Sequence, residues 1–140
     1  MKFNEFQHQP VKPDTYEASM ALNQLMRIGK HAIKLHNMID DAAEMESWVA
    51  KKIDLAGDYV KKVYNYTEGE KAGLYDDGGM TEDAGEGHMS KSTLYHTAKY
   101  AIALMQMIKP GDDLEGWVQS KLNKAADYLQ GVYNYEEYQK

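Results

Sequence analysis

LMRIGKHAIKLHNMIDDAAEMESWVAKKIDLAGDYVKKVYNYTE, residues 25–68, aligns without a gap to LYHTAKYAIALMQMIKPGDDLEGWVQSKLNKAADYLQGVYNYEE, residues 94–137, at a constant offset of 69. Of the 44 aligned pairs, 19 are identical, including the Val-Tyr-Asn-Tyr sequence near the end of each stretch. A match of this length indicates duplication of one folding unit. We call the two stretches repeat 1 and repeat 2. The comparison between them shows which positions tolerate substitution.

Apolar residues in repeat 1 recur at steps of three and four, which predicts two amphipathic helices. Asp14 and Glu17 form a capping-box pattern before the first helix, and Asp41 and Glu44 repeat it after a turn at residues 40–43. The first apolar face consists of Ala21, Leu25, Ile28, Ala32, Leu35 and Ile39, and the second of Met45, Val49, Ile53, Ala56, Val60 and Val63.

Repeat 2 shows the same two apolar faces. Ser92 is expected to cap its first helix, and the sequence Lys-Pro-Gly-Asp-Asp at residues 109–113 is expected to end that helix, because proline cannot continue one. The two faces consist of Leu94, Ala101, Leu104 and Ile108, and of Leu114, Val118, Leu122, Ala125, Leu129 and Val132.

A helical hairpin of this size exposes half of its apolar surface when it stands alone, so two hairpins should bury their faces against each other. The sequence therefore predicts an all-α protein, in which tandem duplicated helical hairpins form a four-helix bundle. We expect an extended N-terminal arm at residues 1–13, hairpins at residues 14–68 and 90–140, and an acidic, Gly-rich linker at residues 69–89.

The composition argues against several classes of protein. The net charge of −6 and pI near 5.3 disfavour a nucleic-acid-binding protein, which needs clustered cations. No run approaches the roughly 18 apolar residues that a membrane span requires, and the N-terminus lacks the apolar centre of a secretion signal. Cysteine is absent, which excludes disulfides and thiol chemistry. We expect a protein that stays in a cytosol or is packaged from one, and that binds neither nucleic acid nor membrane.

The sequence offers no metal, cofactor or catalytic site. A duplicated metal centre should keep its ligands in both repeats, but no histidine recurs between them. The acidic residues 76–87 do not fit the spacing of a calcium-binding EF-hand loop. Phosphate-binding loops, nucleophile elbows and dinucleotide fingerprints are missing too. We therefore expect no enzyme activity and no cofactor.

Two sets of residues outside the apolar faces are identical in both repeats. The first lies on one flank of each second helix: Trp48, Lys52, Tyr59 and Tyr66, with Trp117, Lys121, Tyr128 and Tyr135. Such residues either cover the edge of the core or form an aromatic recognition face. The second set is predicted to face solvent and consists of Asp58, Asn65, Asp127 and Asn134. Its survival reflects chance, a hydrogen bond within the helix, or a contact that both repeats make with a partner.

The N-terminal arm contains both phenylalanines of the chain, Phe3 and Phe6, followed by Pro10 and Pro13. The prolines favour an extended backbone. Large apolar groups in a segment without its own core suggest anchoring, either on this bundle or on a neighbouring subunit.

The second half of each repeat resembles a small helical module found in virion structural and uncharacterised proteins of tailed bacteriophages. The shared pattern is an acidic residue two before Trp-Val, then Lys, Ala, Asp-Tyr and a Tyr-rich end, and the resemblance covers about 88 of the 140 residues. In repeat 1 it is met by Glu46, Trp48, Val49, Lys52, Ala56, Asp58, Tyr59, Tyr64 and Tyr66, and in repeat 2 by the residues equivalent to these.

The resemblance implies a non-enzymatic component of a phage virion, such as a minor capsid, decoration or head-associated protein. Its expected partners are other virion proteins, above all the capsid shell, together with self-association. The alternative is a soluble adaptor or inhibitor that binds a host or phage protein through its repeated helical faces. The candidate partner-binding residues are Phe3, Phe6, Trp48, Asp58, Asn65, Trp117, Asp127 and Asn134.

Overall fold

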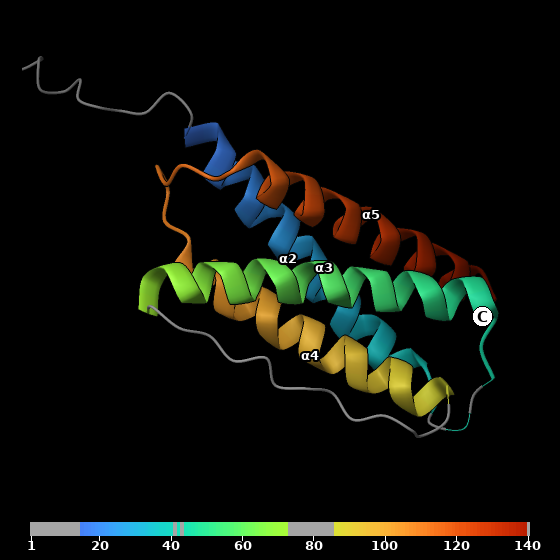
Figure 1. The fold of residues 1–140 in the computed structure, drawn as a ribbon. Helices are drawn as coiled ribbons and strands as arrows, with labels where there is room; N and C mark the ends of the chain where they lie inside the picture. Colours follow the sequence, from blue (N-terminus) through green and yellow to red (C-terminus); the bar gives the residue numbers. More distant parts are fainter. Residues whose placement is uncertain (1–14, 41, 43, 73–85, 140) are drawn as a thin grey trace, which may run out of the picture.

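The computed structural model describes residues 15–40, 42, 44–72 and 86–139. Four α-helices make up this part of the chain (Figure 1). They are α2 (Thr15–Met38), α3 (Ser47–Ala72), α4 (Glu86–Met107) and α5 (Gly116–Gln139). The described residues contain no strand, so the predicted all-α four-helix bundle is confirmed.

The apolar faces predicted from the sequence form the core. Twelve of its large side chains are fully buried and come from all four helices. Two of the predicted members, Met45 and Leu114, lie at the ends of the bundle and are only partly buried. The remaining predicted core residues are Ala21, Leu25, Ile28, Ala32, Leu35, Ile39, Val49, Ile53, Ala56, Val60, Val63, Leu94, Ala101, Leu104, Ile108, Val118, Leu122, Ala125, Leu129 and Val132, all of them buried.

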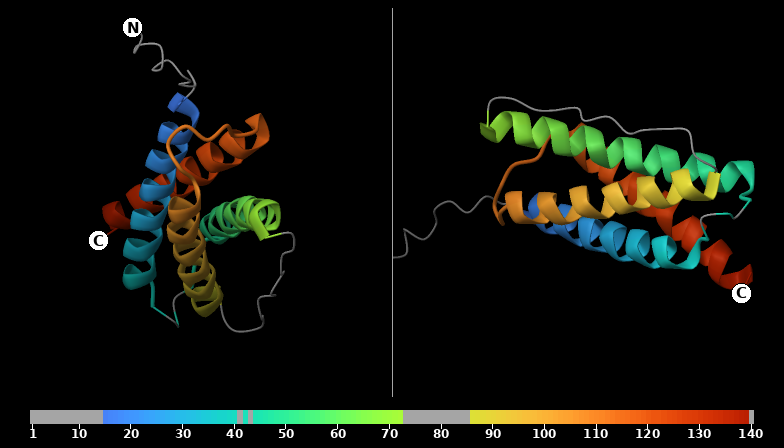
Figure 2. Two further views of the ribbon diagram at one scale, coloured as in Figure 1. Left: turned by 90° about the vertical axis from the view of Figure 1, so that its left-hand side faces the viewer. Right: turned by 90° about the horizontal axis from the view of Figure 1, so that it is seen from below.

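The two repeats interlock. Each helix packs on two others, and the order round the bundle is α2, α4, α3, α5. No Cα atom of α2 lies within 8 Å of one in α3, and the same holds for α4 and α5 among the described residues. The two helices of one repeat therefore lie diagonally opposite each other, and every helix packs only on helices of the other repeat. Figure 2 shows α2 beside α4, with α3 on the far side of α4.

Contacts along the helices fix their directions. Lys91, near the start of α4, donates hydrogen bonds to carbonyl oxygens at the end of α2, so these two helices are antiparallel. Trp48 contacts Tyr135, which makes α3 and α5 antiparallel as well. Hydrogen bonds from Gln24 to Asn123 and from Arg27 to Gln130 show that α2 and α5 are parallel. The helices α3 and α4 are parallel as well, so the end of α3 and the start of α4 lie at opposite ends of the bundle.

Two predicted helix starts are wrong. The helix α3 begins at Ser47, because the Glu46 carbonyl accepts from the backbone N–H groups of Val49 and Ala50, so the Asp41 and Glu44 capping pattern lies before the helix. Ser92 lies inside α4 rather than at its start. Ser90, one turn before Leu94, is 3% exposed, so packing on the core extends the helix past the predicted cap.

The helices also extend into the predicted linker. Residues 69–72 belong to α3 and residues 86–89 to α4, while residues 73–85 lie outside the described part of the chain. The N-terminal arm with Phe3 and Phe6 lies outside it too, as does Asp14.

Candidate functional site

The aromatic residues on the flank of each second helix, which are identical in both repeats, form a contact between the repeats. We call them the aromatic stripe. The Trp48 ring meets the Tyr135 ring edge-on at 4.9 Å and 74°, and Trp117 meets Tyr66 at 4.9 Å and 75°. Because these residues are equivalent across the repeats, one contact is made twice about a pseudo-two-fold axis between α3 and α5. Edge-to-face pairs of this kind add about 0.5–1.5 kcal/mol beyond area burial.

Each Trp–Tyr contact is extended by a hydrogen bond. The Tyr135 hydroxyl donates to the Glu46 carboxylate at 2.8 Å, and the Tyr66 hydroxyl donates to the Glu115 carboxylate at 2.9 Å. Both glutamates stand at the start of a helix, where the backbone N–H groups favour negative charge. The hydrogen bond to Glu46 raises the pKa of Tyr135.

In the middle of the stripe, a lysine of each repeat lies over a tyrosine ring of the other repeat. The Lys52 ammonium lies 4.2 Å from the Tyr128 ring centroid, and the Lys121 ammonium lies 4.3 Å from that of Tyr59. The two tyrosine rings stack at 6.0 Å on the pseudo-two-fold axis. We name this set the aromatic clasp, which consists of Glu46, Trp48, Lys52, Tyr59, Tyr66, Glu115, Trp117, Lys121, Tyr128 and Tyr135.

The clasp accounts for the retention of these residues, because each repeat needs them to bind the other. This favours the structural alternative of the sequence analysis over an aromatic recognition face. Trp48 and Trp117 still expose 41% and 38% of their surface, nearly equal values at equivalent positions.

The four retained polar residues do not form one surface. Asp58 is exposed and pairs with Lys62 one turn later at 3.4 Å, while Asp127 and Asn134 are exposed in the other repeat. Asn65 departs from the prediction that it faces solvent: its side chain is partly buried, and its buried Oδ1 accepts no hydrogen bond within the described residues. Because Asp58 borders α4, the pseudo-two-fold axis places Asp127 beside α2, across the molecule.

An exposed apolar face that the sequence analysis missed lies on the outside of α2 and α4. Met26 is 55% exposed, Ile33 46%, Tyr95 51% and Ile102 45%. Met26 is equivalent to Tyr95, and Ile33 to Ile102. Gly29 on α2 lies close to Ala101 on the antiparallel helix α4, so the residues of the two helices stand at the same height along the bundle. The Tyr95 ring on α4 lies 6.2 Å from the His36 ring on α2. We name these four residues the outer face.

The outer face carries positive charge although the chain is acidic overall. Lys30 and Lys99, which are equivalent, are exposed between its apolar residues, and the Lys99 ammonium lies 5.5 Å from the Tyr95 ring centroid. Glu17 is the one acidic residue at positions 17–38 and 89–107, against five lysines and arginines. The spacing of seven residues from Met26 to Ile33 and from Tyr95 to Ile102 was the sequence pattern that could have revealed this face.

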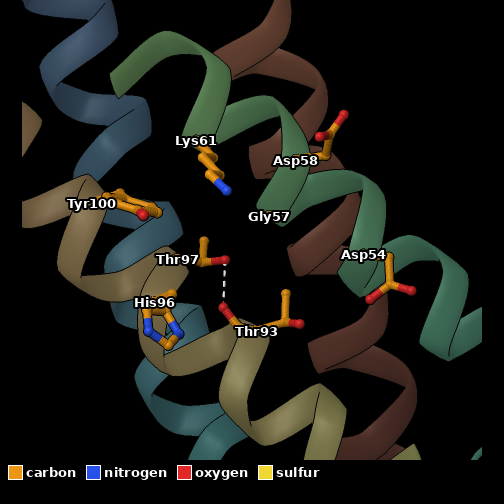
Figure 3. Close-up of a pocket in the computed structure, with 8 residues that line it drawn as sticks. All are labelled: Asp54, Gly57, Asp58, Lys61, Thr93, His96, Thr97 and Tyr100. Atoms are coloured by element: carbon orange, nitrogen blue, oxygen red, sulfur yellow. Dashed lines mark hydrogen bonds between the residues drawn. The ribbon is translucent and has the colours of Figure 1, made fainter. Parts of the chain in front are cut away.

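A groove lies between α3 and α4 (Figure 3). Its volume is about 370 Å³, within the range of small-molecule sites. Its lining residues are Asp54, Gly57, Asp58, Lys61, Thr93, His96, Thr97 and Tyr100. Partial burial beside the groove raises the pKa of Asp54.

Comparisons with known proteins found no match for this chain among protein-family models, curated proteins or solved structures. The described residues contain no group of three or more potential metal ligands. None of the described helices is long and apolar enough to cross a membrane.

Proposed function

We propose that this chain is a non-enzymatic structural component of a tailed-phage virion, and that it docks on a larger assembly through the outer face of α2 and α4. The observation that carries the proposal is the exposure of equivalent apolar side chains in both repeats. Ile33 and Ile102 are identical, and each leaves nearly half of its surface in solvent. Core packing gives no reason to retain them.

The apolar and charged residues of the outer face indicate what kind of surface the partner has. Burying an exposed side chain of this size is favourable by about 1.5–3 kcal/mol when it becomes fully covered. Lys30 and Lys99 lie between the apolar residues, so a complementary surface has apolar groups with carboxylates placed between them. The pseudo-two-fold arrangement suits a partner that offers two equivalent contacts. The resemblance to the phage module supports the choice of a virion protein.

The first experiment asks whether the protein is part of the particle and whether the outer face holds it there. The test variant is Ile33→Ser with Ile102→Ser, and quantitative mass spectrometry of purified particles measures its incorporation. The matched control is Met20→Ser with Met89→Ser, an equivalent pair that is also exposed but lies about 120° round each helix from Met26 and Tyr95. Both variants remove two half-buried apolar side chains, so they should lose similar amounts of stability in urea unfolding.

We expect the test variant to be lost from particles and the control to be retained. Equal incorporation of both variants would contradict docking through the outer face. Absence of the wild-type protein from purified particles would contradict the virion role and would favour the soluble adaptor or inhibitor.

A further inference from the structure

The pseudo-two-fold axis relates two grooves that differ in content. One lies between α2 and α5, and its equivalent lies between α4 and α3. In the first, the Gln24 amide donates to the Asn123 side chain at 3.1 Å, and the Arg27 guanidinium donates to the Gln130 side chain at 2.6 Å. These two bridges close the surface between the helices.

The second groove lacks both bridges. Thr93 and Asp54 stand where the first groove has Gln24 and Asn123, and His96 and Lys61 replace the other pair. Among the described residues, no hydrogen bond or ion pair joins Thr93 to Asp54 or His96 to Lys61. The exchange removes two hydrogen-bonded pairs and leaves four polar groups round the groove. The surface is thus bridged between α2 and α5 and open between α3 and α4.

The polar groups of the open groove are held in place. The Thr97 hydroxyl donates to the Thr93 carbonyl at 2.7 Å, and Thr97 is 2% exposed. His96 Nδ1 lies 2.9 Å from the Ser92 carbonyl, so this nitrogen carries the proton and Nε2 is left as the second polar atom of the ring. Figure 3 shows the Lys61 ammonium extending across the groove above Gly57, toward the side of Thr97 and Tyr100.

The two charged groups differ in sign and in place. Asp54 and Lys61 are seven residues apart, which places their Cα atoms about 10.5 Å apart along α3 on the same side. Asp58 lies between them but pairs with Lys62. Lys61 would repel a ligand that carries only positive charge, and Asp54 would repel one that carries only negative charge. A ligand with one charge of each sign, placed at its two ends, satisfies both.

We propose that the groove between α3 and α4 binds a short zwitterion of dipeptide size. Its carboxylate lies at Lys61 and its ammonium group at Asp54, and its middle lies over Gly57 between Thr93 and Tyr100. The volume of about 370 Å³ holds a molecule of this size. This site is separate from the outer face and does not rest on the docking function.

The test is an NMR titration of the full-length, ¹⁵N-labelled protein with dialanine. Two capped probes serve as ligand controls: N-acetyl-dialanine lacks the ammonium group, and dialanine amide lacks the carboxylate. We expect dialanine to shift the backbone amides of Gly57, Thr93 and His96, and each capped probe to bind at least tenfold more weakly. Absence of shifts at millimolar dialanine, or equal binding of a capped probe, would overturn the proposal.

A variant built from the chain itself supplies the protein control. It transfers the closed groove to the open one by four exchanges: Asp54→Asn, Lys61→Gln, Thr93→Gln and His96→Arg. The circular dichroism spectrum should stay unchanged, because the same side chains already bridge α2 and α5, and dialanine binding should fall at least tenfold. A second variant, Gln24→Thr with Asn123→Asp, alters the closed groove and should bind dialanine as the wild type does. Binding retained by the first variant, or lost by the second, would place the ligand elsewhere and overturn the assignment.

Discussion

Replacing Gly57 by alanine tests how closely α3 and α4 approach. A Cβ atom at this position would lie 2.7 Å from the Thr93 Cγ2 atom and 3.0 Å from the Thr97 Oγ1 atom. The equivalent residue in repeat 2 is Ala126, which is buried without such a conflict. The substitution therefore sets the helix propensity of alanine against the space between the helices.

The two effects have opposite signs and comparable sizes. Alanine in a helix interior is favoured over glycine by about 1 kcal/mol. Overpacking a tight contact costs about 1–3 kcal/mol. Thr97 cannot give way without breaking its hydrogen bond to the Thr93 carbonyl, which would leave a buried hydroxyl unpaired at a cost of about 1–3 kcal/mol. We expect Gly57→Ala to lower the free energy of unfolding by about 1 kcal/mol.

Gly131 supplies the matched control. A Cβ atom there meets nothing within 4 Å, so Gly131→Ala should raise the free energy of unfolding by about 0.5–1 kcal/mol. Urea unfolding followed by circular dichroism measures both, with a shared slope showing that the unfolded state is unchanged. Adding Thr93→Ser to Gly57→Ala removes the Cγ2 atom and should restore part of the loss. If Gly57→Ala stabilises the protein as much as Gly131→Ala does, the close approach of α3 and α4 is wrong.

Two further predictions concern single side chains. Lys91→Met removes hydrogen bonds of 2.8 and 2.9 Å to carbonyls at the end of α2 and should lower the free energy of unfolding by about 1–2 kcal/mol in urea, and no loss would contradict that cap. Burial, with the charges of nearby Arg27, Lys34 and Lys30, lowers the pKa of His31 below 6.5. As the pH falls, His31 therefore takes up a proton in the unfolded state at a higher pH than in the folded state. The free energy of unfolding should fall as the pH drops below about 6.5. His31→Tyr, which copies Tyr100, should weaken that dependence, and an NMR titration giving an unshifted or raised pKa would refute the argument.

The helix content and the core could be predicted because the periodicity of the apolar residues is local and occurs twice. The pairing of the helices could not, since the same faces suit a hairpin that packs on itself and one that interlocks with its copy. The clasp decides this: the Trp48 ring meets Tyr135 of the other repeat edge-on and does not contact Tyr66 of its own repeat, which meets Trp117. Only the positions of the helices in space distinguish these two partners.

The sites were harder to predict for a related reason. Residues identical in both repeats drew attention to the clasp, which holds the molecule together. The open groove lies where the repeats differ, as at Lys61 and Gln130, so a search for retained residues passes over it. Asn65 shows a second limit, because a helical wheel marks the face of one helix but not the neighbour that covers it.

Double-mutant cycles on the clasp test the interlocked fold most directly. The cycle of Trp48→Ala with Tyr135→Ala should give a coupling energy of about 0.5–1.5 kcal/mol in urea unfolding, and the equivalent cycle of Trp117→Ala with Tyr66→Ala should match it. The cycle of Trp48→Ala with Tyr66→Ala joins residues of one repeat and should be additive within about 0.5 kcal/mol. Coupling between Trp48 and Tyr66, with additivity between Trp48 and Tyr135, would show that each repeat packs on itself and would contradict the interlocked bundle.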